Sequence, residues 1–247
     1  MLRSGYGKII VFIKTTVVMS RRNEFSTTSK NPSKYFLEWK SNDKTFVYYD
    51  KETRENVKID LPFKFLTLAE MHTVKGWHDA SQSGVFANEV KFIGTEELNV
   101  RAFKGGEIAK GLYKDIKVKV KSLGGHYARS VYILVGEDIW NIQLKGSAVQ
   151  AWGDFTQKTR SRLSDEWISI TGANEQKKGS IKYTTPEFSF DGSLTEEEAK
   201  HADAAYDKLT AYVEAYTKKN EEAEVEVTQD IPQDVVAEEF DTDELSF

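Results

Sequence analysis

Cysteine is absent from the 247 residues, which excludes disulfides and thiol chemistry and removes the commonest zinc ligands. No run of eighteen apolar residues occurs, so the sequence contains no candidate membrane span. Histidine occurs four times, and His72 and His78 lie six apart rather than at the four-residue spacing of a metal-binding helix. We therefore expect no metal and no cofactor. Hydrophobic residues make up 39% and aromatic residues 12% of the chain, as in a folded protein.

Charge is distributed unevenly along the chain. The net charge is -5, yet residues 221–247 hold eleven acidic residues and neither Lys nor Arg. The remaining 220 residues therefore carry a net charge of +6 (-5 minus -11). A basic body with an acidic tail indicates a nucleic acid or another polyanion as the partner.

The composition predicts one folded domain with a flexible segment at each end. Residues 1–33 are expected to form a flexible arm, in which Lys14 interrupts the apolar run that a signal peptide needs and Met19 offers a second start. Residues 1–18 are then an extension outside the fold. Residues 34–219 are expected to form the domain, including a C-terminal helix, and residues 220–247 a disordered acidic tail.

The central segment, residues 86–155, predicts the fold class. It reads as strand, strand, helix, strand, strand, helix, with alternating apolar residues at 98–103 and a helical stripe from Ile108 to Leu123. Gly124-Gly125 would end that helix. This order is typical of an OB-fold, a small barrel that binds oligonucleotides. We therefore predict a mainly β protein, an OB-fold-like barrel with an inserted helix and a C-terminal helix.

Flanking segments add further elements to this domain. Two runs, 35–39 and 45–49, are expected to form a hairpin, and residues 63–74 one long strand. Residues 76–84 read as an exposed polar loop around Trp77. Two more strands are expected at 167–170 and 180–183 around a polar turn at 174–179. Thr195 and Glu198 form a capping box that opens a helix to about Tyr216.

The motifs that could support catalysis are weak. His78-Asp79 lies in the expected loop, where an ordinary surface histidine is the simpler interpretation. Lys104-Gly105-Gly106-Glu107 resembles a phosphate cradle but lacks the Gly-Lys-Ser/Thr ending of a P-loop, so a tight turn is preferred. We predict no catalytic residue and no enzyme, with an enzyme using His78 and Asp79 as the remaining alternative.

Basic and aromatic residues alternate in the predicted strands. Single-strand binders combine a positively charged groove with rings on which bases stack. Each ring alone is more simply a core residue, except Trp77, which the polar loop would leave exposed. The predicted nucleic-acid-binding residues are Trp39, Lys40, Lys75, Trp77, Arg101, Phe103, Lys104, Arg129 and Tyr132.

The C-terminus combines acidic residues with an apolar tip. A solubilising tail would explain Asp243 and Glu244 but not Leu245 and Phe247. The predicted partner-binding residues of the tail are Phe240, Asp243, Glu244, Leu245 and Phe247.

This tail resembles those of bacterial and phage single-stranded DNA-binding proteins, where a terminal Phe docks on replication partners. The body resembles single-stranded DNA-binding proteins of tailed bacteriophages, the crAss-like group among them. The matching stretches span most of residues 34–155 and comprise residues 35–39, 61–63, 75–77, 88–90, 103–106 and 110–113. A helix between barrel and tail departs from the bacterial type, which leaves the oligomeric state open.

The resemblance implies a protein that coats single-stranded DNA without strong sequence preference during phage replication or recombination. It implies partner recruitment through the tail, no membrane association, and a location in the bacterial host cytoplasm. Two alternatives are a strand-annealing recombination protein and a phage virion or packaged structural protein, in which the aromatic strands would form interfaces.

Overall fold

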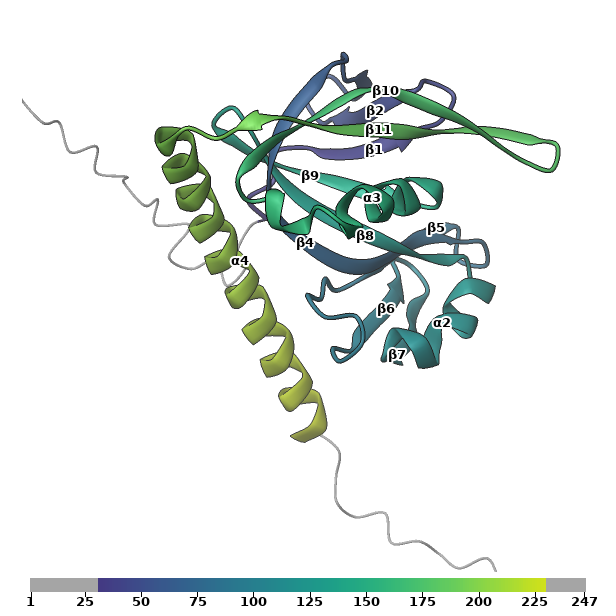
Figure 1. Ribbon diagram of the computed structural model, residues 1–247. Helices are drawn as coiled ribbons and strands as arrows, with labels where there is room; N and C mark the ends of the chain where they lie inside the picture. Colours follow the sequence, from purple (N-terminus) through teal and green to yellow (C-terminus); the bar gives the residue numbers. More distant parts are fainter. Residues whose placement is uncertain (1–30, 230–247) are drawn as a thin grey trace, which may run out of the picture. The chain divides into compact units, whose positions relative to one another are not determined.

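The computed structural model describes residues 31–229 (Figure 1). Residues 31–214 form one compact unit, and residues from Ala215 onward are grouped with a second unit. The described residues contain eleven strands, three α-helices and a short 3-10 helix, so the mainly β class is confirmed.

One sheet path organises the compact unit. The strands are β1 (Phe36–Lys40), β2 (Thr45–Asp50), β3 (Glu55–Lys58), β4 (Phe63–His78), β5 (Ser83–Ala87), β6 (Leu98–Ala102), β7 (Gly106–Gly111), β8 (Gly125–Val135), β9 (Asp138–Lys145), β10 (Glu166–Lys178) and β11 (Ile181–Ser193). Their order is β3-β2-β1-β9-β8-β4-β5-β6-β7, with β10 pairing both β4 and β11. Only the β1–β9 pair is parallel among these. Within the described residues β3 and β7 do not pair with each other, so the sheet is not closed into the expected barrel.

The long strand β4 connects the two halves of the sheet. One edge pairs with β8 over most of its length, while the other edge pairs with β10 at Phe63–Phe65 and with β5 at Lys75–His78. Because strand side chains alternate, Glu70 and Val74 lie on one face and Met71 and Lys75 on the other. The first face carries most of the apolar core, and the second is partly open.

Three helices cover parts of the sheet: α2 (Tyr113–Ser122), α3 (Ser147–Gln157) and α4 (Glu196–Gln229). Trp152 of α3 and Val120 of α2 are buried on the face of Glu70 and Val74. Leu209 of α4 is buried against Met71 and Tyr132 on the opposite face. The second face is therefore covered at one end and exposed at the other.

The prediction of a helix from Ile108 to Leu123 is half wrong. Residues 106–111 form β7, in which Ile108 and Ala109 are buried against β6, and α2 starts only at Tyr113. Gly111 has a φ of 136°, which ends the strand. The predicted stop at Gly124-Gly125 is confirmed, with Gly124 at φ 81°.

Two predicted loops are also strand. Trp77 lies within β4, and only residues 79–82 form the turn to β5. Residues 174–178 belong to β10, so the β10–β11 hairpin is longer than predicted and projects from the body (Figure 1). The hairpin of β1 and β2, the strand at 63–74 and the helix at 147–155 are confirmed.

The capping box at the start of α4 is confirmed in atomic detail. The Thr195 Oγ1 accepts a hydrogen bond from the Glu198 amide at 3.3 Å, and Glu198 Oε2 accepts one from the Thr195 amide at 2.8 Å. The helix continues to Gln229, ten residues into the predicted tail segment. The first 30 residues of the predicted N-terminal arm and the tail residues Phe240 to Phe247 lie outside the described residues.

Candidate nucleic-acid interface

Two exposed aromatic side chains flank a glycine on three neighbouring strands. Trp77 of β4 pairs directly with Gly84 of β5, and the Gly84 carbonyl accepts a 3.0 Å hydrogen bond from the Phe103 amide at the end of β6. Trp77 is 52% and Phe103 77% exposed, and a Cβ built on Gly84 would meet no atom within 4 Å. We call these three residues the slot, because no atom fills the space above Gly84 between the strand positions of Trp77 and Phe103.

The width of this slot suits one flat ring. Two strand spacings separate Trp77 from Phe103, which amounts to about 10 Å. A planar ring midway between them would lie about 5 Å from each, within the distances of about 4.5–7 Å at which aromatic rings pair. The slot can therefore hold one base between an indole and a phenyl ring.

A second row lies beside the slot. Lys75 of β4 pairs with Phe86 of β5, which pairs with Arg101 of β6. Residues directly opposite share a face of the sheet, and the two-residue step from Lys75 to Trp77 places both rows on the same face. Phe86 is 39% exposed and Arg101 is exposed. We call the surface formed by Lys75, Trp77, Gly84, Phe86, Arg101 and Phe103 the open face.

Basic residues extend the open face toward β1. Glu38 accepts hydrogen bonds from Lys145 at 2.7 Å and Lys40 at 3.1 Å. Burial of the Glu38 carboxyl opposes its ionisation, but these two lysines outweigh that effect and hold its pKa below 4.5. One carboxylate thus neutralises only one of the two ammonium groups that it contacts, which leaves a local excess of one positive charge.

Lys75 is the most constrained cation of this surface. Burial lowers its pKa below 10.5, the Glu89 carboxylate opposes that shift, and the positive charge of Lys145 adds to it. Lys75 has no ion pair within the part of the chain that the structure describes. An incoming phosphate would give Lys75 an ion-pair partner, which neither Glu89 nor Glu38 forms with it.

Five of the nine predicted binding residues share this side of the sheet: Lys40, Lys75, Trp77, Arg101 and Phe103. Lys104 follows Phe103 in the exposed turn before β7, where its amide donates to the Ser83 Oγ. The structure therefore brings five of the predicted residues together along one surface, with Lys104 in the adjoining turn.

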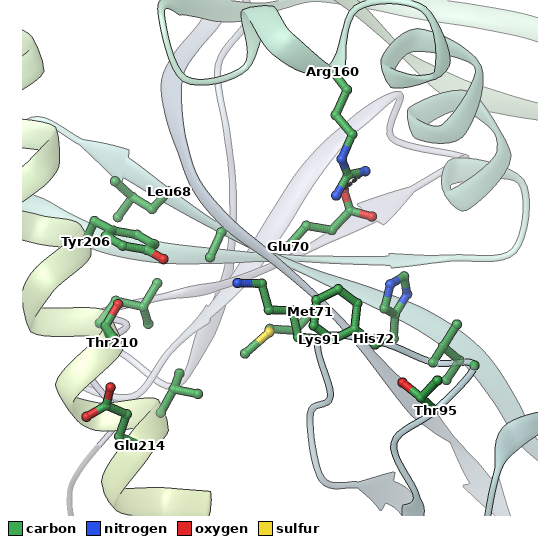
Figure 2. Close-up of a pocket in the computed structure, with 16 residues that line it drawn as sticks. Leu68, Glu70, Met71, His72, Lys91, Thr95, Arg160, Tyr206, Thr210 and Glu214 are labelled. Atoms are coloured by element: carbon green, nitrogen blue, oxygen red, sulfur yellow. Dashed lines mark ion pairs between the residues drawn. The ribbon is translucent and has the colours of Figure 1, made fainter.

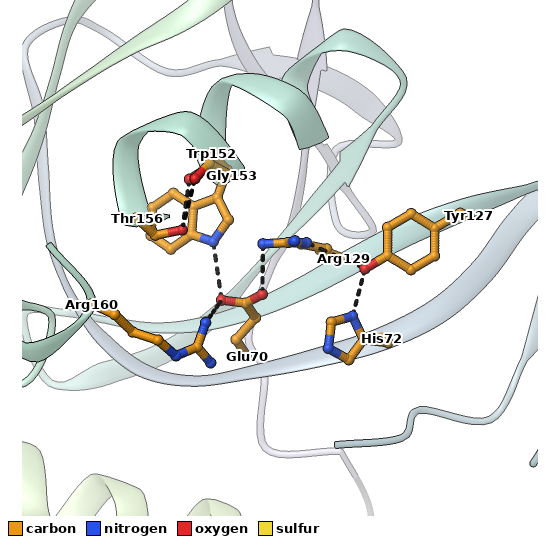
Figure 3. A network of polar contacts seen from close by, with 8 residues as sticks. All are labelled: Glu70, His72, Tyr127, Arg129, Trp152, Gly153, Thr156 and Arg160. Carbon is orange, nitrogen blue, oxygen red and sulfur yellow. Dashed lines mark hydrogen bonds and ion pairs between the residues drawn. The ribbon is translucent and has the colours of Figure 1, made fainter. Parts of the chain in front are cut away.

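Arg129 lies on the other face of the sheet, away from the open face. Its Nη1 is 2.8 Å from the Oε1 of Glu70, whose side chain is 6% exposed and whose Oε2 accepts the Trp152 indole N–H at 3.2 Å (Figure 3). Arg160 approaches the same carboxylate at 3.6 Å. Arg129 is therefore the counter-ion of a buried carboxylate that anchors α3.

His72 belongs to the same network. Arg129 Nε donates to the Tyr127 hydroxyl at 3.3 Å, and the same hydroxyl forms a 2.5 Å hydrogen bond with His72 Nδ1 (Figure 3). Burial lowers the pKa of His72, while Glu70 opposes the shift. The position of His72 in this network, rather than any exposed site, sets the environment of its imidazole.

Trp39 and Tyr132 are also withdrawn from solvent. The Trp39 indole packs on Phe46 and donates to the Thr184 carbonyl at 2.9 Å. Tyr132 is 0% exposed, and its hydroxyl donates to Glu89 at 2.5 Å. Neither ring presents a face to a base, because packing and hydrogen bonds occupy both side chains.

The sequence interpretation missed Phe86, Gly84 and Lys145. Phe86 stands between two buried residues, Val85 and Ala87, so the alternation of β5 places it on the exposed side. That alternation was visible in the sequence. The pairing that sets Gly84 between Trp77 and Phe103 was not.

Comparison with protein-family models, curated proteins and solved structures gives no match.

A second concave site lies along the β4 edge between β10 and β5. It is a groove of ≈ 700 Å³ whose walls are mainly apolar, with Leu68 and Met71 facing Tyr206 and Thr210 of α4 (Figure 2). His72 and Glu70 reach this groove, but both are held by the network around Arg129. The groove therefore offers apolar contact rather than acid–base chemistry.

The other predicted functional features have structural roles. His78 Nδ1 lies 2.7 Å from the Ser81 Oγ in the β4–β5 turn. Residues 103–105 form the β6–β7 turn and Gly106, at φ 75°, is the first residue of β7, so these glycines do not start a helix. No group of three or more His, Asp or Glu side chains within residues 31–229 is placed to hold a metal ion. No helix in that range is long and apolar enough to cross a membrane.

Proposed function

We propose that the protein binds single-stranded DNA without strong sequence preference through the open face. The slot formed by Trp77, Gly84 and Phe103 supports this most directly, because every base has a π-face and stacking is tolerant of sequence. Two exposed aromatic rings on either side of a glycine leave apolar surface in contact with water, and exposed apolar surface of this kind is typical of a binding site.

Stacking supplies most of the affinity at this surface. The positive charges of its four basic residues, Lys40, Lys75, Arg101 and Lys145, are offset by three nearby carboxylates. These are Glu38, Glu89 and Glu107, the last being the cross-strand neighbour of Arg101. The surplus charge is small, whereas stacking contributes about 1–3 kcal/mol per base.

The proposal includes an OB-type barrel, since OB-folds are partly open barrels that bind oligonucleotides on a strand face. It also includes the tail, through which Leu245 and Phe247 would dock on replication or recombination proteins in the bacterial cytoplasm. A virion or packaged structural protein is the competing function, in which the open face would be a protein interface.

Trp77→Ala tests the proposal against a matched control. Fluorescence anisotropy of a labelled dT oligomer should show weaker binding by about 1–3 kcal/mol, with the melting temperature little changed. Tyr49→Ala removes a ring of similar exposure (55%) from β2, four strands away, and should bind as the unmodified protein does. Equal affinities for all three proteins, or no binding at all, would favour the structural role.

A further inference from the structure

The β10–β11 hairpin carries a concentration of lysines that the open face does not explain. β10 pairs with β4 only from Ile168 to Ile170, so residues 174–183 form a two-stranded arm. A two-stranded hairpin is marginally stable alone. This arm is held at its base, because the Thr184 amide donates to the Ser41 Oγ at 2.6 Å and the Thr184 hydroxyl donates to the Ser41 carbonyl at 2.8 Å.

Trp39 reinforces the same anchor through its indole N–H, which donates to the Thr184 carbonyl. At the tip, Gly179 supplies the positive φ of 62° that a two-residue hairpin turn requires. The arm is thus a fixed ribbon, with a defined face toward the β1–β2 turn.

Two lysines lie directly opposite each other on that face. Lys177 pairs with Lys182 across the ribbon, and like charges in such pairs are destabilising because their Cβ atoms lie about 4.5–5.5 Å apart. Neither forms an ion pair with any described residue. A pair of this kind becomes favourable when an anion lies between the two ammonium groups.

The surroundings complete a concave site. Lys177 and Lys182 line a notch of ≈ 480 Å³ between the arm and the β1–β2 turn, together with Ser41, Asn42 and Lys44. The single acid there is Glu175, which lies 2.6 Å from Lys44 and whose pKa is lowered first by that hydrogen bond and also by Lys182. Three lysines against one carboxylate leave a net charge of +2. We call this site the arm notch.

We propose that the arm notch binds phosphates of the same single-stranded DNA whose bases stack on the open face. This inference rests on the proposed function and divides it, with stacking at the open face and phosphate contacts at the arm. Five strand spacings, about 24 Å, separate β6 from β1, where the β1–β2 turn begins. Trp39, which holds the arm, alternates with Lys40 and therefore lies on the face opposite the open face, so the DNA strand must also pass the end of β1 to reach the notch. A strand long enough to cross the sheet and pass that end reaches both sites, and a very short one does not.

The test removes the opposed lysines and measures salt dependence. For Lys177→Gln with Lys182→Gln, the plot of log K against log salt for dT of about 16 nucleotides should become shallower by about 1.4, since each phosphate contact on single strands contributes about 0.7. Binding of dT of about 4 nucleotides should stay unchanged. Lys114→Gln with Lys117→Gln removes the same charge from exposed positions of α2 and should keep the original slope.

The outcomes separate the two proposals. An unchanged slope in the arm variant, or an equal change in the α2 control, overturns the arm notch. If Trp77→Ala still weakens binding in that case, the open face stands without it. A lower slope in the arm variant with no effect of Trp77→Ala supports the notch and overturns the open face.

Discussion

Filling the floor of the slot should raise stability and lower DNA affinity at once. Gly84→Val adds a side chain that points between Trp77 and Phe103, because directly paired residues share a face. The position has open space and no positive φ, so the new side chain is accommodated without strain.

Both magnitudes follow from the geometry. Glycine in a strand costs roughly 0.5–1 kcal/mol relative to a residue with a Cβ, so Gly84→Val should stabilise the fold by about that amount. Blocking one stacked base should cost about 1–3 kcal/mol of binding, which weakens the affinity about 5- to 150-fold. Opposite signs for folding and binding distinguish a blocked site from a damaged fold.

Anisotropy titrations with labelled dT and thermal melts measure the two effects. Gly153→Ala is the control, because Gly153 lies in α3 on the opposite side of the sheet and also has nothing within 4 Å of a built Cβ. It should raise the melting temperature and leave DNA affinity alone. Full affinity in a stable Gly84→Val variant would refute the slot, and a lower melting temperature would refute its open floor.

Two further predictions concern the charges on the two faces. Burial holds the pKa of Lys75 below 10.5 and a bound phosphate favours the ammonium form, so DNA affinity should fall as the pH rises through that lowered pKa. The Lys75→Arg variant stays charged and should abolish this loss of affinity in anisotropy titrations between about pH 8 and 10. Equal pH dependence in both proteins would contradict the role of Lys75. Glu70→Gln leaves Arg129 without its counter-ion and should destabilise the fold by about 3 kcal/mol in denaturant unfolding, with DNA affinity unchanged. A loss of DNA affinity at normal stability would instead indicate that Arg129 contacts DNA.

The long strand β4 shows how far the sequence alone could lead. Its apolar alternation predicted a strand over 63–74, but the glycine and polar residues after Val74 read as a loop. In the structure Gly76 is needed for a different reason, because a Cβ there would lie 1.9 Å from the Gly124 carbonyl oxygen. The glycine permits a close approach of β8 inside the sheet, and only the partner strand reveals that.

The misassigned start of α2 has a local cause. The apolar run around Ile108 is short. The spacing of Ile108, Ala109 and Leu112 is compatible with a helix, and Ile108 is also compatible with an alternating strand, so the run does not distinguish the two periods. Pairing with β6 decides the outcome, since β6 and β7 are joined by the tight turn at residues 103–105. Similarly, Arg129 and Tyr132 were both predicted to bind DNA, but they lie on opposite faces of β8, and the docking of α3 and α4 determines which side chains are buried.

The distribution of charge now links the two proposed sites. On the open face each basic residue has a carboxylate nearby, so added salt should change its contribution little. In the arm notch the lysines are more exposed, with Lys44 at 56%, and exceed the acids by two, so their contribution should fade as salt rises. Binding at high salt should therefore depend more on the open face than on the arm notch. Trp39 was predicted to stack on DNA. It holds the arm through Thr184, and in the proposed division of roles it would position the lysines that bind the phosphates.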